Sequence, residues 1–288
     1  MQNKLNNNLY VIFRGGLGNQ LFILATAFVI AQKYSLKMVI EPNLGFLRDV
    51  YQRKYELDEI LDGAFKKTSI IEKLKIGLYF KFPKIANKLF GNSNIISDEN
   101  MMYISSYDNY TNIYFGLGQD EGFIQNYKQE IRGILLSKAS NNIHYEDSVV
   151  KIAIHGRIAR NTDNNGDVIS TASPNELEIS YYEKAIKQIV KKYPKAVFCI
   201  FSDNVELFLE YLQVDNRNKR FLKTGNNNQN KAFQDFIEML SCDHFIIANS
   251  TFSWWAAYLG ERESSLVICP HITFWDSSII IPQHWIQI

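Results

Sequence analysis

The stretch IIANSTFSWWAAYLG, residues Ile246–Gly260, decides the fold class of the second half of the chain. Its apolar start, together with Phe245, is typical of a buried strand, and apolar residues then recur at helical spacing over 252–259. The polar residues 249–251 between them predict backbone N–H groups and hydroxyls at a helix N-terminus, which is a good anion site for a group such as a diphosphate. The alternative interpretation is that these residues only cap the helix.

The rest of the chain shows the same alternation. Strands are expected at 9–14, 37–41, 151–155, 196–202, 221–222, 244–248 and 266–269. Helices are expected at about 19–34, 180–193, 204–212, 230–242 and 251–259. The middle of the chain, 48–145, shows no clear pattern. Strands that alternate with helices predict parallel sheets, here as two Rossmann-like domains, 1–146 and 147–288, which face a ligand cleft at the carboxyl ends of their strands.

The composition narrows the function classes. The 288 residues carry a net charge of +1, so no global charge favours nucleic acid as a partner. The first eight residues lack an apolar core, so no secretory signal is expected, and no apolar run is long enough to span a membrane. The three cysteines form no CxxC pair and are predicted to be buried free thiols in a reducing compartment.

A glycine-rich loop, RGGLGNQ at 14–20, follows the first strand. It lacks the dinucleotide fingerprint, because Leu21 stands where a third glycine is needed, and it has no P-loop lysine. The loop is either a tight turn or a close backbone approach to a ligand, in which the amides of Asn19 and Gln20 offer hydrogen bonds.

Two more loops follow strands in the second half. Arg157 stands at a strand end, where a guanidinium suits phosphate, and His155 could donate to phosphate or act as a base. The alternative is an exposed arginine and a satisfied histidine. Asp203, at the end of another strand, is either a helix N-cap or an acceptor for guanine N–H groups or a ribose hydroxyl.

These blocks, in this order, resemble those of bacterial α-1,2-fucosyltransferases of glycosyltransferase family 11. The GGLGNQ block is intact at 15–20, the FSD element at 201–203 and the NS(S/T)FSWW block at 249–255. The family helix resembles YYEKAI at 181–186, and the family ending resembles IPQHWI at 281–286. The similarity spans nearly the whole chain.

One block departs from the family pattern. HxRRxD has become HGRIAR at 155–160, so the second arginine is Ile158 and the acid is Arg160. In related enzymes the first arginine contacts the donor's β-phosphate, and this role carries over to Arg157 alone. The changed block is compatible with an altered donor sugar, an altered acceptor, or a weak or inactive enzyme. The polar loop that follows, 161–167, is a candidate border of the acceptor.

The resemblance implies a GT-B-like fold, in which the C-terminal half binds GDP-β-L-fucose and the N-terminal half lies on the acceptor side. It implies inverting transfer of L-fucose to O2 of a terminal galactoside, in bacterial surface polysaccharide or O-antigen synthesis. The implied catalytic residues are Arg157, His155 and Asn19. The implied donor-binding residues are Gly16, Gly18, Asn19, Arg157, Asp203, Asn249, Ser250, Thr251 and Ser253. The proton acceptor stays open among His155, Asp163 and Asp167.

No DxD, HExxH or CxxC pattern occurs in the chain, so we expect no metal and no cofactor, with the GDP-sugar as donor substrate. Two alternatives remain: a transferase of another GDP-6-deoxyhexose such as colitose, and a non-catalytic protein that binds nucleotide or glycan.

The segment 70–90 mixes five lysines and one glutamate with aliphatic and aromatic residues. One interpretation is a peripheral membrane contact, which would suit a lipid-linked glycan acceptor. The other is core packing with a solvated lysine face. The expected location is the bacterial cytoplasm, with or without attachment to the inner face of the cytoplasmic membrane.

Overall fold

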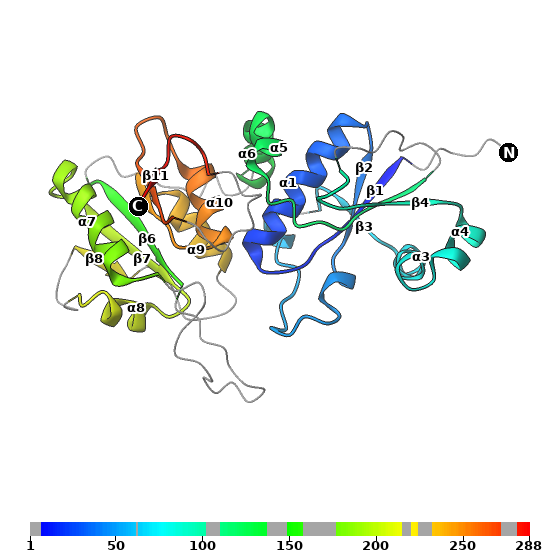
Figure 1. The fold of residues 1–288 in the computed structure, drawn as a ribbon, viewed down its shortest axis with the longest axis horizontal. Helices are drawn as coiled ribbons and strands as arrows, with labels where there is room; N and C mark the ends of the chain where they lie inside the picture. The colour runs from blue at the N-terminus through cyan, green and yellow to red at the C-terminus, as the bar shows by residue number, and fades with distance from the viewer. Residues whose placement is uncertain are drawn as a thin grey trace. The chain divides into compact units, whose positions relative to one another are not determined.

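The chain forms two compact units in a computed structural model, Met1–Ser137 and Lys138–Ile288. The structure describes residues 7–61, 63–101, 110–136, 149–157, 177–214, 220–223, 232–271 and 281–288. Each unit is an α/β layer structure built on its own parallel sheet (Figure 1).

Unit 1 is built on a parallel five-stranded sheet of order β3-β2-β1-β5-β4. Its strands are β1 (Asn8–Ile12), β2 (Lys37–Glu41), β3 (Lys66–Lys67), β4 (Ser93–Ile96) and β5 (Thr111–Tyr114). Its α-helices are α1 (Leu17–Lys33), α2 (Asp58–Leu61), α3 (Ile70–Lys81), α4 (Pro83–Phe90), α5 (Glu121–Ile124) and α6 (Lys128–Leu136). Two 3₁₀ turns, η1 (Leu44–Phe46) and η2 (Gln125–Tyr127), complete the described elements.

The centre of unit 1 is almost entirely apolar. β1 pairs with β2 on one side and β5 on the other, and its residues from Leu9 to Ile12 are buried. α1 is buried on nearly every side, which fits its continuous run of apolar residues. This rigid centre sets the position of the glycine loop, which joins β1 to α1.

Unit 2 is built on a parallel six-stranded sheet of order β11-β10-β9-β6-β7-β8. Its strands are β6 (Lys151–Gly156), β7 (Val197–Ser202), β8 (Phe221–Lys223), β9 (His244–Ile246), β10 (Val267–Cys269) and β11 (Ile286–Gln287). Its helices are α7 (Ile179–Lys192), α8 (Val205–Tyr211), α9 (Ala232–Leu240) and α10 (Thr251–Gly260). Trp254 and Trp255 of α10 are fully buried and form the largest part of its packing surface.

The predicted fold class is confirmed, since both sheets are parallel and the predicted strands and helices are present to within a few residues. The region 48–145, which showed no clear pattern, holds α3, α4 and two strands of only four residues each, the internal strand β5 and the edge strand β4. The three cysteines are buried free thiols, as expected. No helix in the described part of the chain is long and apolar enough to cross a membrane. The predicted roles of the two domains, their limits at 146 and 147, and the cleft between them stay predictions.

Candidate functional site

Three neighbouring strands of unit 2 end beside one another and bring the predicted residues of the second half together. β6 lies between β9 and β7, so the segments that follow these strands share one edge of the sheet. The His155 ring lies 5.5 Å, centroid to centroid, from the ring of Phe252 in the first turn of α10. The described residues 155–157 of the HGRIAR block and the start of the NSTFSWW block therefore lie at the same edge of the sheet.

Two tyrosines of α7 hold the strand ends in place. The Tyr182 hydroxyl donates a hydrogen bond to the backbone oxygen of His155 at 3.3 Å. The Tyr181 hydroxyl lies 2.7 Å from the backbone oxygen of Ile247 and 3.1 Å from that of Ile268. Because the donors come from one helix, α7 sets the relative positions of the ends of β6, β9 and β10. The YYEKAI block thus has a structural role behind the site.

His155 is buried, and its Nδ1 has no hydrogen-bond partner in the described part of the chain. Burial, and then the nearby positive charge of Arg157, lower the pKa of the imidazole to about 3. The ring is therefore neutral at pH 7 and is a weak base in the free protein. A diphosphate bound beside Arg157 would cancel that charge and raise the pKa of His155.

Arg157 and Asp203 follow residues that pair directly across β6 and β7, Gly156 and Ser202. Both side chains are exposed, and the structure records no hydrogen bond or ion pair between Arg157 and a described residue. The predicted cap was wrong for Asp203, because Asn204 caps α8 by accepting from the Leu207 N–H at 3.1 Å. The Asp203 carboxylate instead accepts a hydrogen bond from the Ser202 hydroxyl at 3.2 Å.

The anion site was predicted at the first turn of α10, and anion binding there stays a prediction. Ser250 is the N-cap residue, as the alternative interpretation expected, but its side chain makes no capping hydrogen bond. The Asn249 side chain is buried and its Oδ1 has no partner among the described residues. Thr251 is half-buried at the helix start. Ser253 is fully buried, and its hydroxyl is 3.2 Å from the Ser250 backbone oxygen, a structural contact.

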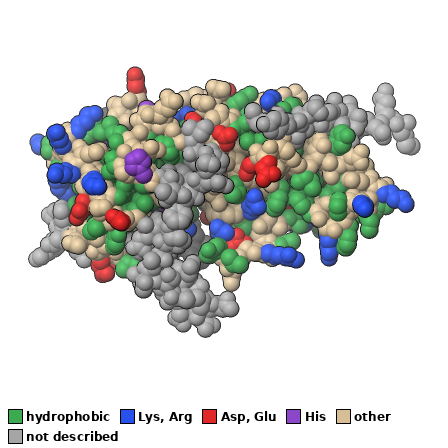
Figure 2. Space-filling model, in the orientation of Figure 1, with side chains coloured by type: hydrophobic (Ala, Val, Ile, Leu, Met, Phe, Trp, Pro, Cys, Tyr) green, Lys and Arg blue, Asp and Glu red, His purple; other side chains and the backbone are tan. Residues whose placement is uncertain are grey.

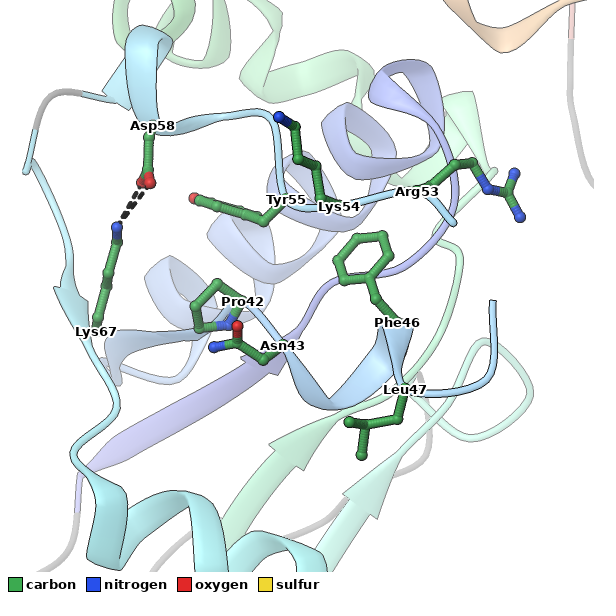
Figure 3. Close-up of a pocket in the computed structure, with 9 residues that line it drawn as sticks. All are labelled: Pro42, Asn43, Phe46, Leu47, Arg53, Lys54, Tyr55, Asp58 and Lys67. Carbon is green, nitrogen blue, oxygen red and sulfur yellow. Dashed lines mark hydrogen bonds and ion pairs between the residues drawn. The ribbon is translucent and has the colours of Figure 1, made fainter. Parts of the chain in front are cut away.

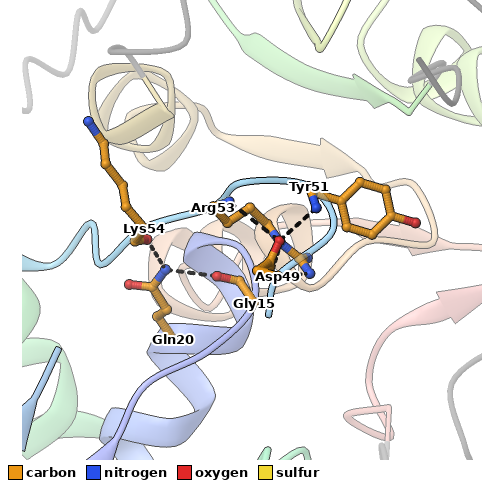
Figure 4. A network of polar contacts seen from close by, with 6 residues as sticks. All are labelled: Gly15, Gln20, Asp49, Tyr51, Arg53 and Lys54. Atoms are coloured by element: carbon orange, nitrogen blue, oxygen red, sulfur yellow. Dashed lines mark hydrogen bonds and ion pairs between the residues drawn. The ribbon is translucent and has the colours of Figure 1, made fainter. Parts of the chain in front are cut away.

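The glycine loop of unit 1 is held in place by hydrogen bonds of a buried side chain. Gln20 is fully buried, and its Nε2 donates to the backbone oxygens of Gly15 and Lys54, each at 2.9 Å (Figure 4). Its Oε1 accepts from the Glu56 N–H at 2.9 Å. The expectation that this amide faces a ligand was therefore wrong. Asn19 is half-buried, and its Oδ1 accepts from Gln119 Nε2 at 3.0 Å.

Two glycines in this loop differ in the space around them. Gly15 has a φ of +77°, and a Cβ there would lie 2.7 Å from Asn19 Nδ2. Gly16 is the N-cap of α1 and has open space where a Cβ would stand, and Gly18 is buried in the first turn of that helix. A close ligand approach is thus compatible with Gly16 and less so with Gly18.

Unit 1 also has a pocket of about 560 Å³ close to the ends of β2 and β3 (Figure 3). It is lined by Pro42, Asn43, Phe46, Leu47, Arg53, Lys54, Tyr55, Asp58 and Lys67. Lys67 pairs with Asp58 at 2.7 Å, and Arg53 pairs with Asp49 at 2.7 Å. The pocket combines aromatic faces with a net positive lining, which suits a polar ligand such as a sugar.

No sequence pattern had assigned a role to Arg14 or Tyr55. Arg14 follows β1, its guanidinium lies 4.4 Å from the centre of the Phe115 ring, and its Nε is buried with no partner in the described residues. The Tyr55 hydroxyl is also buried and has no hydrogen-bond partner among the described residues, and burial raises the pKa of this group. The position of Arg14 directly after a strand, like that of Arg157, was a signal that could have been used.

The remaining predicted residues lie outside the description. Asp163, Asp167 and the substituted positions Ile158 and Arg160 are outside the described residues. Within the described ranges, no group of three or more His, Cys, Asp or Glu side chains could hold a metal ion.

Comparison with known proteins decides the family. A family model described as Glycosyl transferase family 11 matches residues 8–280. The chain belongs to glycosyltransferase family 11. Its blocks at the strand ends of unit 2 are therefore those of a glycosyltransferase, as the sequence predicted.

Two curated relatives of this family 11 chain come from Escherichia coli. It is 25% identical over 300 residues to the O-antigen biosynthesis glycosyltransferase WbnK, with 92% of this chain and 95% of the relative covered. It is also 25% identical over 301 residues to an alpha-1,2-colitosyltransferase, with 95% and 96% covered.

A solved structure supports the fold. The ADP-heptose lps heptosyltransferase II of E. coli matches with a TM-score of 0.50 at 12% identity, covering 98% of this chain and 90% of that one. At this identity the likeness concerns the fold alone. Together with the two parallel sheets, it gives this family 11 enzyme the predicted GT-B-like architecture.

Proposed function

We propose that this family 11 glycosyltransferase moves L-fucose from GDP-β-L-fucose to O2 of a terminal galactoside, with inversion to an α-1,2 linkage. The observation that carries the proposal is the strand-end site of unit 2. There an exposed arginine follows His155, whose ring contacts the first turn of α10, and two buried polar atoms, His155 Nδ1 and Asn249 Oδ1, have no partner among the described residues. Such a site suits a nucleoside diphosphate, because its donors are already oriented.

In this mechanism the acceptor hydroxyl oxygen forms a bond to the anomeric carbon while the bond from that carbon to the diphosphate oxygen breaks. Negative charge grows on the departing GDP, and Arg157 with the first N–H groups of α10 stabilises it. Asp203 accepts hydrogen bonds from guanine or ribose, and the Asn249 amide binds the donor at its buried end.

The acceptor proton leaves as the new bond forms. His155 takes it only if the bound diphosphate raises the pKa of the ring from about 3 toward neutrality. Asp163 and Asp167 remain the other candidates. Asn19 acts at the junction of donor and acceptor, and Gly16, which has open space where a Cβ would stand, allows the glycine loop to approach the donor.

We assign the acceptor to unit 1, where the pocket near Phe46 and Tyr55 offers aromatic faces and Lys54 offers a cation. The acceptor is an oligosaccharide or a lipid-linked glycan of a bacterial surface polysaccharide, and the reaction takes place in the cytoplasm. The role of WbnK in O-antigen biosynthesis supports this assignment. No metal takes part, because the positive charge at the diphosphate comes from Arg157 and from the helix.

A second candidate is transfer of another GDP-6-deoxyhexose, such as colitose. Two observations favour it specifically: the replacement of the second arginine and the acid of HxRRxD by Ile158 and Arg160, and the similarity to an alpha-1,2-colitosyltransferase. Both candidates use the same diphosphate site and differ only in the sugar.

A transfer assay separates these candidates. Purified protein is mixed with GDP-fucose or GDP-colitose and a panel of β-galactosyl acceptors, and both GDP release and glycosidic product are followed. A fucosylated product that is absent from Arg157→Ala supports the main proposal, and a product from GDP-colitose alone supports the second. Binding of GDP without any product would instead favour a non-catalytic binder.

A further inference from the structure

The α3–α4 hairpin presents large apolar side chains to solvent. Ile70 and Ile71 are each 78% exposed, and Leu74 is 64% exposed. Six of the exposed apolar residues of the hairpin, called here the α3–α4 face, are Ile70, Ile71, Leu74, Phe82, Ile85 and Leu89. Isolated apolar residues are common on protein surfaces, but this many large exposed apolar side chains on two helices that pack together point to an interaction site.

The face is a built feature of a firmly held hairpin. Ile70, Ile71 and Leu74 lie within about 100° of one another around α3. Ile76 and Tyr79 project from the opposite side of that helix and are buried in the core of unit 1 with Ala86 of α4. The Tyr79 hydroxyl also donates to the backbone oxygen of Gly91 at 2.9 Å. The interpretation of 70–90 as core packing with a solvated lysine face is therefore confirmed, and the outer side also carries exposed apolar side chains that this interpretation did not include.

The charges around the face have one sign. Lys81, Lys84 and Lys88 are exposed and make no ion pair with a described residue. Glu72, the one acid of 70–90, is engaged by Lys66 at 2.9 Å and forms a capping box with Ser69. Hydrophobic side chains and lysines lie side by side over α3 and α4 in Figure 2.

We infer that the α3–α4 face docks on the surface of an anionic lipid bilayer. Apolar side chains surrounded by unpaired lysines match an interface of acyl chains and negative headgroups. A second copy of the chain fits less well, because a two-fold contact through this face would bring the lysines of both copies together. The inference is independent of the donor sugar and of the transfer reaction.

Vesicle sedimentation without any substrate tests the inference. The full chain is incubated with vesicles of phosphatidylcholine alone and with vesicles that also contain phosphatidylglycerol. We expect binding only to the anionic vesicles, with weaker binding at higher salt. The triple variant Lys81→Gln, Lys84→Gln, Lys88→Gln should lose about a hundredfold in binding, at about fivefold for each lysine near the surface. Its matched control is Lys184→Gln, Lys187→Gln, Lys191→Gln, which removes exposed lysines from α7 and should bind like the wild type.

Two double variants of apolar residues separate the contribution of the lysines from that of apolar side chains that insert into the bilayer. Ile70→Ser with Leu74→Ser should abolish the binding that persists at high salt, whereas Val149→Ser with Leu222→Ser, exposed residues of unit 2, should not. Equal binding of all variants would overturn the inference. So would absence of wild-type binding, or a wild-type dimer that the apolar variants convert to a monomer. Because no donor or acceptor is present, failure here leaves the proposed transfer reaction untouched.

Discussion

The buried Gln20 amide in unit 1 and the buried His155 and Asn249 side chains in unit 2 all lie at or shortly after the ends of buried parallel strands, but they differ in their hydrogen bonding. In unit 1 the buried Gln20 side chain makes hydrogen bonds with Gly15, Lys54 and Glu56. In unit 2 the buried atoms His155 Nδ1 and Asn249 Oδ1 have no partner in the described residues.

This difference separates buried polar groups that stabilise the fold from those that are available to a ligand. A buried polar group costs free energy unless it is hydrogen-bonded, so a satisfied group stabilises the fold, and an unsatisfied group in a defined place indicates a ligand. The comparison predicts that changes at the two sites have different effects. Changes at Gln20 reduce stability, and changes at the strand-end site reduce donor binding and transfer.

The largest effect is expected for Arg157→Ala. Removal of the guanidinium removes charge stabilisation from the departing diphosphate, so kcat/KM for transfer should fall by about 10²- to 10³-fold. The free energy of unfolding should change by less than about 0.5 kcal/mol, because the side chain is exposed. Steady-state kinetics and urea unfolding measure the two quantities.

Two variants serve as controls for this first prediction. Arg157→Lys keeps the charge but loses the two-pronged contact, and it should be intermediate in activity. Lys187→Ala removes an exposed charge from α7 and should leave the rate unchanged. An Arg157→Ala enzyme with normal kcat/KM would remove Arg157 from the mechanism.

Gln20→Ala should have the next largest effect, this time on stability. It leaves the carbonyls of Gly15 and Lys54 and the N–H of Glu56 without their partner, which should cost about 3 kcal/mol of unfolding free energy. Gln125→Ala, which removes one exposed hydrogen bond at 3.3 Å, is the matched control and should cost less than about 0.5 kcal/mol. Equal urea midpoints for the two variants would refute a structural role for Gln20.

Asn249→Ala should have the opposite effect to Gln20→Ala: a small change in stability and a moderate loss of GDP affinity. Its Oδ1 has no described partner in the free protein, so unfolding should change by less than about 1 kcal/mol. Affinity for GDP should fall about tenfold, because one hydrogen bond to the donor is lost. Titration calorimetry and urea unfolding of the same sample test both parts, and a large loss of stability with unchanged affinity would contradict them.

His155 makes a prediction about pH. Its pKa is about 3 in the folded chain against 6.5 ordinarily, so the unfolded chain takes up this proton first as pH falls. This contribution to stability is complete above pH 6.5 and is lost as pH falls from there toward 3. Relative to His155→Gln, the wild type should lose up to about 1.4 kcal/mol per pH unit in this window. If the difference in unfolding free energy between the two proteins were the same at pH 5 as at pH 7, the assignment would be contradicted.

The smallest expected effect is that of chelation. If arginine and helix donors neutralise the diphosphate, EDTA should leave the transfer rate unchanged, and added Mn²⁺ should not raise it. Activity that collapses in EDTA and returns only with Mn²⁺ would show that the strand-end site lacks part of its positive charge.

Much of this arrangement was predictable because apolar periodicity and strand-end loops carry it. The run from Phe245 to Leu259 predicted β9 and α10, and the apolar runs before Arg157 and Asn249 predicted that both residues follow strands. Both predictions depend on local patterns.

Other features depend on contacts that no local pattern contains. The strands β4 and β5 are only four residues long, and their identity depends on pairing with each other and with β1. The role of Gln20 depends on a segment more than thirty residues away. The exposed side of α3 could not be told from a buried one, since isoleucine and leucine are compatible with both.

The most direct test of the account is calorimetric titration of GDP into wild type, Arg157→Ala and Lys187→Ala, all in EDTA. The account predicts one GDP per chain, at least tenfold weaker binding to Arg157→Ala, and unchanged binding to Lys187→Ala. Equal GDP affinity in all three proteins would contradict the claim that the strand ends of unit 2 hold the donor.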